Sequence, residues 1–174
     1  AANAQTTPIP AEHFPAKGGV AIVSKPSLTL CMIVKDEETS VESALDSASK
    51  VVDDIVVVDT GSTDKTPAIA RKFTSRVYTF PWKDDFAAAR NFAIEHVRTD
   101  WILWLDADEQ LDVTNAKRWQ QSFAAKARDA DALLIKINNY FGAAVDELKM
   151  HVYGGFRLLR TAAKLRYKNP IHEH

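Results

Sequence analysis

Short apolar runs alternate along the chain with longer segments in which apolar residues recur at helical spacing. The runs at 54–59 and 101–105 are apolar almost throughout, which is typical of central strands in a parallel sheet, and a further strand is predicted at about 28–35. The segments between these runs predict helices at about 39–49 and 65–74. This alternation predicts an α/β fold with a mainly parallel sheet flanked by helices.

The pattern changes toward the carboxyl terminus. A short strand is predicted near 76–80, and acidic residues at 84–85 favour a helix start. Asp112 is a candidate cap for a later helix. After Asp131 the apolar runs become shorter and predict antiparallel, hairpin-linked strands at 131–137, about 148–152 and 155–160. We therefore expect the last third of the chain to extend the sheet with antiparallel strands.

Composition divides the chain into a leader and one domain. Residues 1–25 mix Ala, Pro, Thr and Gly without periodicity, so they are predicted to be a flexible leader or linker. Residues 26–174 have the length of one domain, and 46% hydrophobic residues in the whole chain suit one core. The sequence does not decide whether this domain is truncated at its carboxyl terminus.

Charge and hydrophobicity limit the classes of partner. The 22 Lys and Arg residues balance 23 Asp and Glu residues, so no basic field favours nucleic acid. No apolar run approaches the roughly 20 residues that span a bilayer. The single cysteine, Cys31, lies in an apolar run and is predicted to be a buried, unreactive thiol. We expect a soluble, cytoplasmic domain, or one peripheral to the inner face of the membrane.

Acidic residues follow three of the predicted strands. They occur within 35–38, at Asp59 and within 106–109. The carboxyl ends of parallel strands form the ligand-binding edge of an open α/β sheet, where gathered carboxylates repel unless a cation lies among them. Hard divalent ions take one or two carboxylates and complete their shell with substrate phosphates, which suits the pair Asp106 and Asp108. The pattern therefore predicts a metal and a hydroxyl-rich ligand at this edge.

Other binding motifs fit poorly. A calcium-binding EF-hand loop that starts at Asp106 would have Leu111 where glycine is needed and Lys117 where glutamate is needed. The chain has no Gly-x-Gly-x-x-Gly segment and no Walker phosphate loop. These observations disfavour dinucleotide-dependent oxidoreductases and P-loop NTPases.

Four segments resemble, in order, the motifs of family 2 glycosyltransferases, which have the GT-A (Rossmann-like) fold. The segments are Met32–Glu38, Val58–Asp64, Ala89–Asn91 and Leu105–Glu109. The resemblance covers about 28–112 well, and its closest likeness is to the bacterial branch related to lipopolysaccharide-core enzymes. It implies a metal-dependent enzyme of the hexosyltransferase type. Such an enzyme moves a sugar, with inversion, from a UDP- or GDP-sugar to a hydroxyl acceptor, as in synthesis of cell envelope polysaccharide.

The resemblance also implies roles for particular residues. Asp59 would bind the nucleotide base, and Glu37 would line the same nucleotide pocket. Asp106 would meet the ribose or the metal shell. Asp108 of this DXD motif would ligate the manganese or magnesium ion (Mn²⁺ or Mg²⁺) that bridges the diphosphate. Arg90 would lie near the diphosphate or the sugar.

Two positions within the second motif are not assigned the roles of nucleotide or metal ligands. Many relatives have a second Asp where this chain has Thr60, so contacts to the base would differ there. Asp64 is interpreted as a helix cap rather than a ligand.

The candidate for the catalytic base lies near the end of the chain. Relatives carry a His-Glu pair after an arginine-bearing strand that resembles residues 156–160. The resemblance therefore makes Glu173 the candidate base and His172 a candidate third metal ligand, although a frayed terminus or tag remnant would also account for these residues. Asp146 and Glu147 are the next candidates for the base.

Two other functions are alternatives to sugar transfer. A sugar nucleotidyltransferase shares the sheet plan and the metal, but the chain lacks a convincing Gly-rich phosphate loop. A non-catalytic module that binds nucleotide-sugars would keep the binding residues without transfer. The acceptor, whether carbohydrate, lipid-linked or protein, is not specified by these motifs.

Overall fold

The computed structural model describes residues 25–140 and 150–170. Its strands form a six-stranded sheet in the order β3-β2-β1-β4-β6-β5. The strands are β1 (Leu28–Val34), β2 (Asp54–Asp59), β3 (Val77–Thr79), β4 (Trp101–Trp104), β5 (Ala132–Tyr140) and β6 (Met150–Arg160). Strands β1 to β4 pair in parallel, whereas β6 pairs antiparallel with both β4 and β5. The predicted mainly parallel α/β sheet with antiparallel strands toward the carboxyl terminus is thus confirmed.

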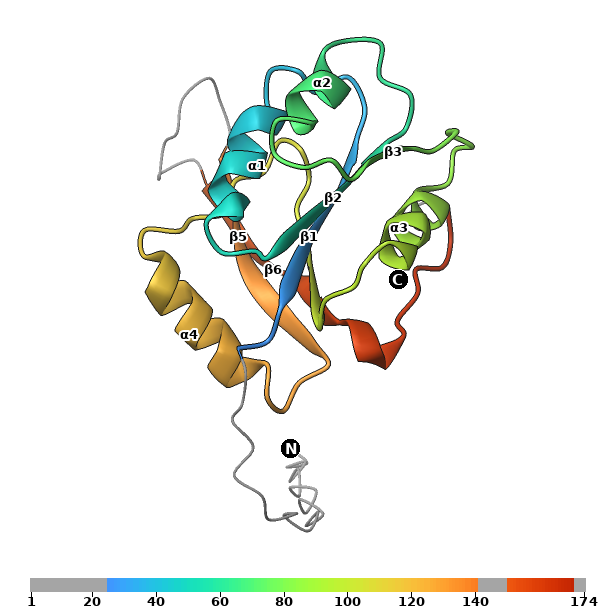
Figure 1. Cartoon of the computed structure of the whole chain (residues 1–174). Helices are drawn as coiled ribbons and strands as arrows, with labels where there is room; N and C mark the ends of the chain where they lie inside the picture. The colour runs from blue at the N-terminus through green and yellow to red at the C-terminus, as the bar shows by residue number, and fades with distance from the viewer. Residues whose placement is uncertain (1–24, 141–149, 171–174) are drawn as a thin grey trace, which may run out of the picture.

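Helices cover both faces of the sheet (Figure 1). They are α1 (Val41–Ser49), α2 (Thr66–Ala70), α3 (Phe86–Glu95), α4 (Ala116–Lys126) and a 3-10 turn, η2 (Thr161–Ala163). Alternate residues of β1 enter different cores. Leu30 packs with α1, α2 and α4 on one face, while Cys31 packs with α3 on the other. Burial raises the pKa of the Cys31 thiol above its ordinary value, which agrees with a predicted unreactive thiol.

Some predicted boundaries were wrong. β6 is one continuous strand instead of two, because Gly154 and Gly155 stay in the ladder opposite β5. Asn115, not Asp112, caps α4, since its side chain accepts a hydrogen bond from the Arg118 N–H at 2.9 Å. Helix α2 is shorter than the predicted 65–74 and ends at Ala70.

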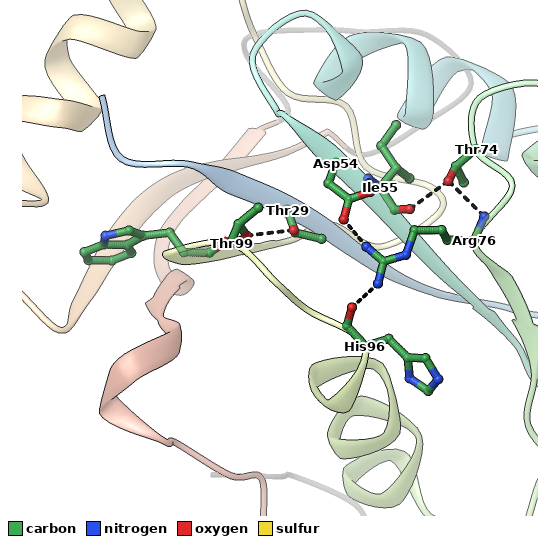
Figure 2. Close-up of polar contacts among 8 residues, drawn as sticks. Thr29, Asp54, Ile55, Thr74, Arg76, His96 and Thr99 are labelled. Carbon is green, nitrogen blue, oxygen red and sulfur yellow. Dashed lines mark hydrogen bonds and ion pairs between the residues drawn. The ribbon is translucent and has the colours of Figure 1, made fainter. Parts of the chain in front are cut away.

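The amino-terminal edge of the sheet is fastened by side chains, as Figure 2 shows. The Arg76 guanidinium donates to the Asp54 carboxylate and to the His96 carbonyl oxygen, so it joins β2 to the end of α3. The Thr74 hydroxyl donates to the Ile55 carbonyl at 2.9 Å. The Thr29 and Thr99 hydroxyls lie 2.7 Å apart and join β1 to the segment before β4. These contacts fix the strands at the edge opposite the predicted site.

The predicted leader lies almost entirely outside the described residues, which begin at Lys25. Among the described helices, none combines the length and the apolar character needed to cross a bilayer.

Candidate active site at the carboxyl edge of the sheet

The loops after β1 and β2 are joined to each other by hydrogen bonds. Asp36 has a positive φ of 53°, and its carboxylate accepts from the Thr63 N–H at 2.7 Å. The Asp64 carboxylate accepts from the Glu38 N–H at 3.0 Å and from the Thr66 N–H at 2.8 Å. Partial desolvation raises the pKa of Asp64, but these hydrogen bonds outweigh it and leave the pKa below its ordinary value. Asp64 therefore joins the loop after β1 to the first residue of α2, but the N-cap of α2 is Lys65 and has no side-chain cap, so the predicted capping role of Asp64 was wrong.

Asp59 is the last residue of β2 and is only 5% exposed. Its two oxygens lie 3.2 and 3.3 Å from the backbone nitrogen of Ser62, which donates to them. Gly61, with φ of 108°, lets the chain turn back so that this contact forms. The neighbouring Thr60 hydroxyl donates to the Val34 carbonyl at 3.1 Å, so in this structure Thr60 ties β2 to β1.

Glu37 lies beside this turn, at the end of β1. Its carboxylate accepts from the Ser40 hydroxyl at 2.5 Å, and its backbone N–H donates to the Thr66 hydroxyl at 2.7 Å. Since β1 and β2 are neighbouring parallel strands, Glu37 and Asp59 follow strands that end at the same edge.

Asp106 follows β4 and is held by two arginines. The Nη1 and Nη2 atoms of Arg157 both lie 3.1 Å from Asp106 Oδ2, and Nη2 of Arg90 lies 3.5 Å from Oδ1. Arg157 Nη2 also lies 2.5 Å from Glu109 Oε1, and the other Glu109 oxygen accepts from the Asp106 N–H. The arginine side chains are 14% and 16% exposed, whereas that of Asp106 is 44% exposed. The result is a compact ion-pair cluster that opens to solvent on the Asp106 side.

The acidic residues of this cluster differ in their electrostatic surroundings. Burial raises the pKa of Glu109 above its ordinary value, and the hydrogen bond from the Asp106 N–H and the charge of Arg157 offset this only in part. Asp108, by contrast, is exposed and forms no hydrogen bond or ion pair with any residue that the structure describes. Asp108 is therefore an exposed acidic residue without a partner in the described part of the protein.

Helix α3 positions Arg90. The helix begins at Asp85, whose side chain accepts from the Ala88 N–H at 2.8 Å. The Arg90 guanidinium then stacks 4.8 Å from the Trp104 ring and 5.4 Å from the Tyr167 ring. Asn91 holds Tyr167 in place, because its side-chain amide exchanges two hydrogen bonds with the Tyr167 backbone, at 2.9 and 3.0 Å.

A pocket of about 210 Å³ lies next to Asp106. Its lining combines the two arginines with aromatic residues and the β5–β6 hairpin: Arg90, Trp104, Ile137, Tyr153, Gly155, Phe156, Arg157 and Tyr167. A larger hollow of about 460 Å³ lies between α1 and residues 110–114, but its walls contain none of the predicted site residues. The smaller pocket is thus the better candidate for substrate.

The structure brings together Arg90 and Asp106 of the predicted set and places Asp108 beside them. Sequence reasoning missed Arg157 as a site residue, although a charged residue within the apolar run of β6 was a signal. His172 and Glu173 lie outside the described residues. No group of three or more His, Cys, Asp or Glu side chains within 25–140 and 150–170 is arranged to hold a metal ion.

Sequence comparison finds relatives that match most of the chain, one of which is named as a glycosyltransferase. A TPR repeat-containing protein of Synechococcus elongatus is 35% identical over 153 residues, which are 84% of this chain and 34% of that protein. The glycosyltransferase SunS of Bacillus subtilis is 28% identical over 85% of this chain and 34% of its own length. This chain thus spans about a third of the length of these relatives.

Structural comparison agrees on the fold. The crystal structure of residues 1–349 of S. aureus TarS superposes with a TM-score of 0.63 at 20% identity. The match covers 82% of this chain and 50% of that one.

The family itself is shown by sequence, whereas the likeness to the lipopolysaccharide-core branch stays a prediction. Residues 29–168 match the family described as Glycosyl transferase family 2, and that range includes each of the four predicted motifs. The chain therefore belongs to glycosyl transferase family 2.

Proposed function

We propose that this domain transfers a sugar, with inversion, from a UDP- or GDP-sugar to a hydroxyl acceptor, with a divalent cation at Asp106 and Asp108. The observation that carries the proposal is the contrast within the DXD motif. Asp106 is held by arginines that also line a pocket, and Asp108 faces solvent without a described partner. In a member of this family, Asp106 and Asp108 would hold a divalent metal ion, which would offset the negative charge of a diphosphate.

The donor set fits a hard cation. Two carboxylates are the usual protein contribution to a Mg²⁺ site, with substrate phosphates and water completing the shell. His172 is the proposed third ligand. When bound, the metal ion would offset the negative charge that develops on the departing nucleoside diphosphate, which is worth several kcal/mol. Arg90 lies close enough to Asp106 to assist at the diphosphate.

The nucleotide is proposed to lie over the ends of β1 and β2. The Asp59 carboxylate uses one backbone N–H, so it has lone pairs left for an N–H of the base. Glu37 is proposed to line the same pocket. S. aureus TarS has been crystallised with UDP and with UDP-GlcNAc, which makes uridine nucleotides the first donors to test.

Inversion in a single displacement needs a base that takes the proton of the attacking hydroxyl. Glu173 is proposed for this role, with Asp146 and Glu147 as the next candidates. Glu173→Gln keeps the size of the side chain but removes its basicity. Transfer should therefore fall while the affinity for the donor stays near that of the wild type.

A thermal-shift panel tests the proposed function. The full chain is melted with UDP-GlcNAc, UDP-glucose and a GDP-sugar, each with Mn²⁺ and with EDTA. A true donor raises the melting temperature by mass action, because it binds only the native state. Stabilisation that needs Mn²⁺ and is followed by slow release of the sugar supports a transferase, and stabilisation without any release favours a binding module. Equal melting temperatures in all mixtures would contradict the proposal.

A further inference from the structure

Arg157 occupies the place at which a cation would neutralise Asp106. Both of its terminal nitrogens contact the same oxygen, Asp106 Oδ2, at 3.1 Å, and one of them also contacts Glu109. Arg90 approaches the other Asp106 oxygen at 3.5 Å. Both oxygens of the proposed metal ligand therefore face a guanidinium in this structure.

The fold holds Arg157 in this position. It lies on β6, which pairs with β4 just before the chain reaches Asp106. A Cβ at Gly155 would lie 2.9 Å from Ile137 Cδ1, so the glycine leaves room for Ile137, whereas Arg157 Nε at 3.6 Å would be in ordinary contact. The side chain is 16% exposed, so the guanidinium is directed into the cluster rather than into bulk water.

We propose that Arg157 is an internal counter-ion that holds Asp106 until metal and donor bind, and that it then contacts the donor diphosphate. This inference rests on the proposed function. A guanidinium and a dication that share one carboxylate repel each other, so metal alone must displace Arg157 from Asp106. A diphosphate gives Arg157 a new anionic partner and removes that cost.

Coupled binding follows from this exchange. If the nucleotide makes room for the metal at Asp106, each ligand raises the affinity for the other by the same factor. Typical couplings are about 5- to 150-fold. A purely structural Arg157, which only ties β6 to the loop after β4, would leave this coupling untouched when it is replaced.

The experiment measures Mn²⁺ binding directly. Free Mn²⁺ is followed by electron paramagnetic resonance in the full chain, with and without UDP, for the wild type, Arg157→Gln and the control Arg118→Gln. Arg118 is an exposed residue of α4 and matches the change in net charge. Without UDP, Arg157→Gln should bind Mn²⁺ about 30-fold more tightly, the effect of removing one positive charge about 4 Å from a dication in aqueous surroundings. The coupling factor should be smaller in this variant than in the wild type, because only the direct attraction between metal and diphosphate remains, and it should stay at the wild-type value in Arg118→Gln.

The outcomes separate this inference from the proposed function. Wild-type coupling that persists unchanged in Arg157→Gln would overturn the counter-ion role and leave the metal-dependent transferase standing. A wild type that binds Mn²⁺ neither alone nor with UDP would overturn both. If Arg157→Gln fails to fold, Arg157→Lys replaces it, since lysine keeps the charge but loses the paired contact to Asp106. Its coupling factor should then lie below that of the wild type, and an unchanged factor would contradict the inference.

Discussion

The two edges of the sheet both carry aspartates but use them differently. At the amino-terminal edge, Asp53 accepts from the Leu28 N–H at 2.9 Å and Asp100 accepts from the Ser27 N–H at 2.8 Å. Asp54 accepts from the Ile55 N–H at 2.9 Å and also pairs with Arg76. At the carboxyl edge, Asp106 is held only through exchangeable side chains and Asp108 has no described partner. Acids at the first edge are held by backbone N–H groups, whereas among the described residues no backbone N–H donates to the carboxylates of Asp106 and Asp108.

The nature of the partner therefore separates structural from functional acids better than position does. Asp36 and Asp64 lie at the functional edge, yet backbone N–H groups occupy them and they shape the loops. A backbone donor cannot leave without refolding the loop, while an arginine side chain can rotate toward a ligand. This contrast predicts which substitutions lower activity and which lower stability.

The largest effect is expected at the acid without a partner. Asp108→Asn should lower transfer by about 10²- to 10⁴-fold, because a metal at such a site contributes several kcal/mol. The melting temperature should change little, since Asp108 makes no described contact. Sugar transfer and thermal unfolding are measured on the same preparation, with the exposed Asp129→Asn as control. Loss of stability in proportion to loss of activity would place Asp108 with the structural acids.

Arg76→Met should produce the opposite result. It removes the bond to the His96 carbonyl and leaves Asp54, whose side chain is 26% exposed, without its cation. We expect the free energy of unfolding to fall by about 1.5–3 kcal/mol, the usual cost of losing charged hydrogen bonds. Urea unfolding measures this, with the exposed Arg71→Met as control. If Arg76→Met lowered the affinity for UDP but kept the stability of the wild type, the assignment of this edge to the fold would be wrong.

Asp59 tests an intermediate case, because it is buried and also proposed to bind the base. Asp59→Asn keeps an oxygen for the Ser62 N–H but loses the charge. UDP binding should weaken by about 1–3 kcal/mol, as expected for a hydrogen bond to a charged group. Calorimetric titration of UDP gives the affinity. An unchanged affinity with a lower melting temperature would show that Asp59 serves only the turn.

The smallest effect concerns Asp100 and pH. Hydrogen bonds from the Ser27 hydroxyl and N–H hold the pKa of Asp100 below its ordinary value, so its contribution to stability is present above the unfolded pKa and is lost as pH falls through the folded pKa. Asp100→Asn should cost about 0.5–1 kcal/mol at pH 7, a value discounted because the side chain is exposed. The difference from the wild type in urea unfolding should begin to shrink below about pH 4, near the ordinary pKa of aspartate, and vanish only below the lower pKa of the folded state. A difference that is the same at pH 7 and pH 3 would exclude a charge effect.

Sequence patterns were sufficient for the parallel half of the fold. β1, β2 and β4 are apolar almost throughout because they are covered on both faces, and the acids after them follow directly from the sequence. The antiparallel half depends on pairing between distant segments. That Gly154 and Gly155 remain within β6 is decided by their partners on β5, which no local pattern reveals.

In the candidate site, too, some residues could be predicted from local motifs, whereas others depend on the pairing of distant segments. The DXD pair and Arg90 could be predicted from motifs, but the Arg157 contact spans 51 residues to Asp106 and depends on how β6 aligns with β4. Likewise, Asp112 seemed a suitable cap from its position, yet Asn115 has the extended backbone that a cap requires.

Calorimetric titration of UDP into the full chain, in Mn²⁺ and in EDTA, tests the central claim that the carboxyl edge is a metal-dependent nucleotide site. The account predicts clear binding in Mn²⁺ and weak binding in EDTA, because Asp106, Asp108 and a diphosphate otherwise repel one another. In Asp108→Asn the two titrations should become alike. Equal UDP affinity in Mn²⁺ and in EDTA for the wild type would contradict the account.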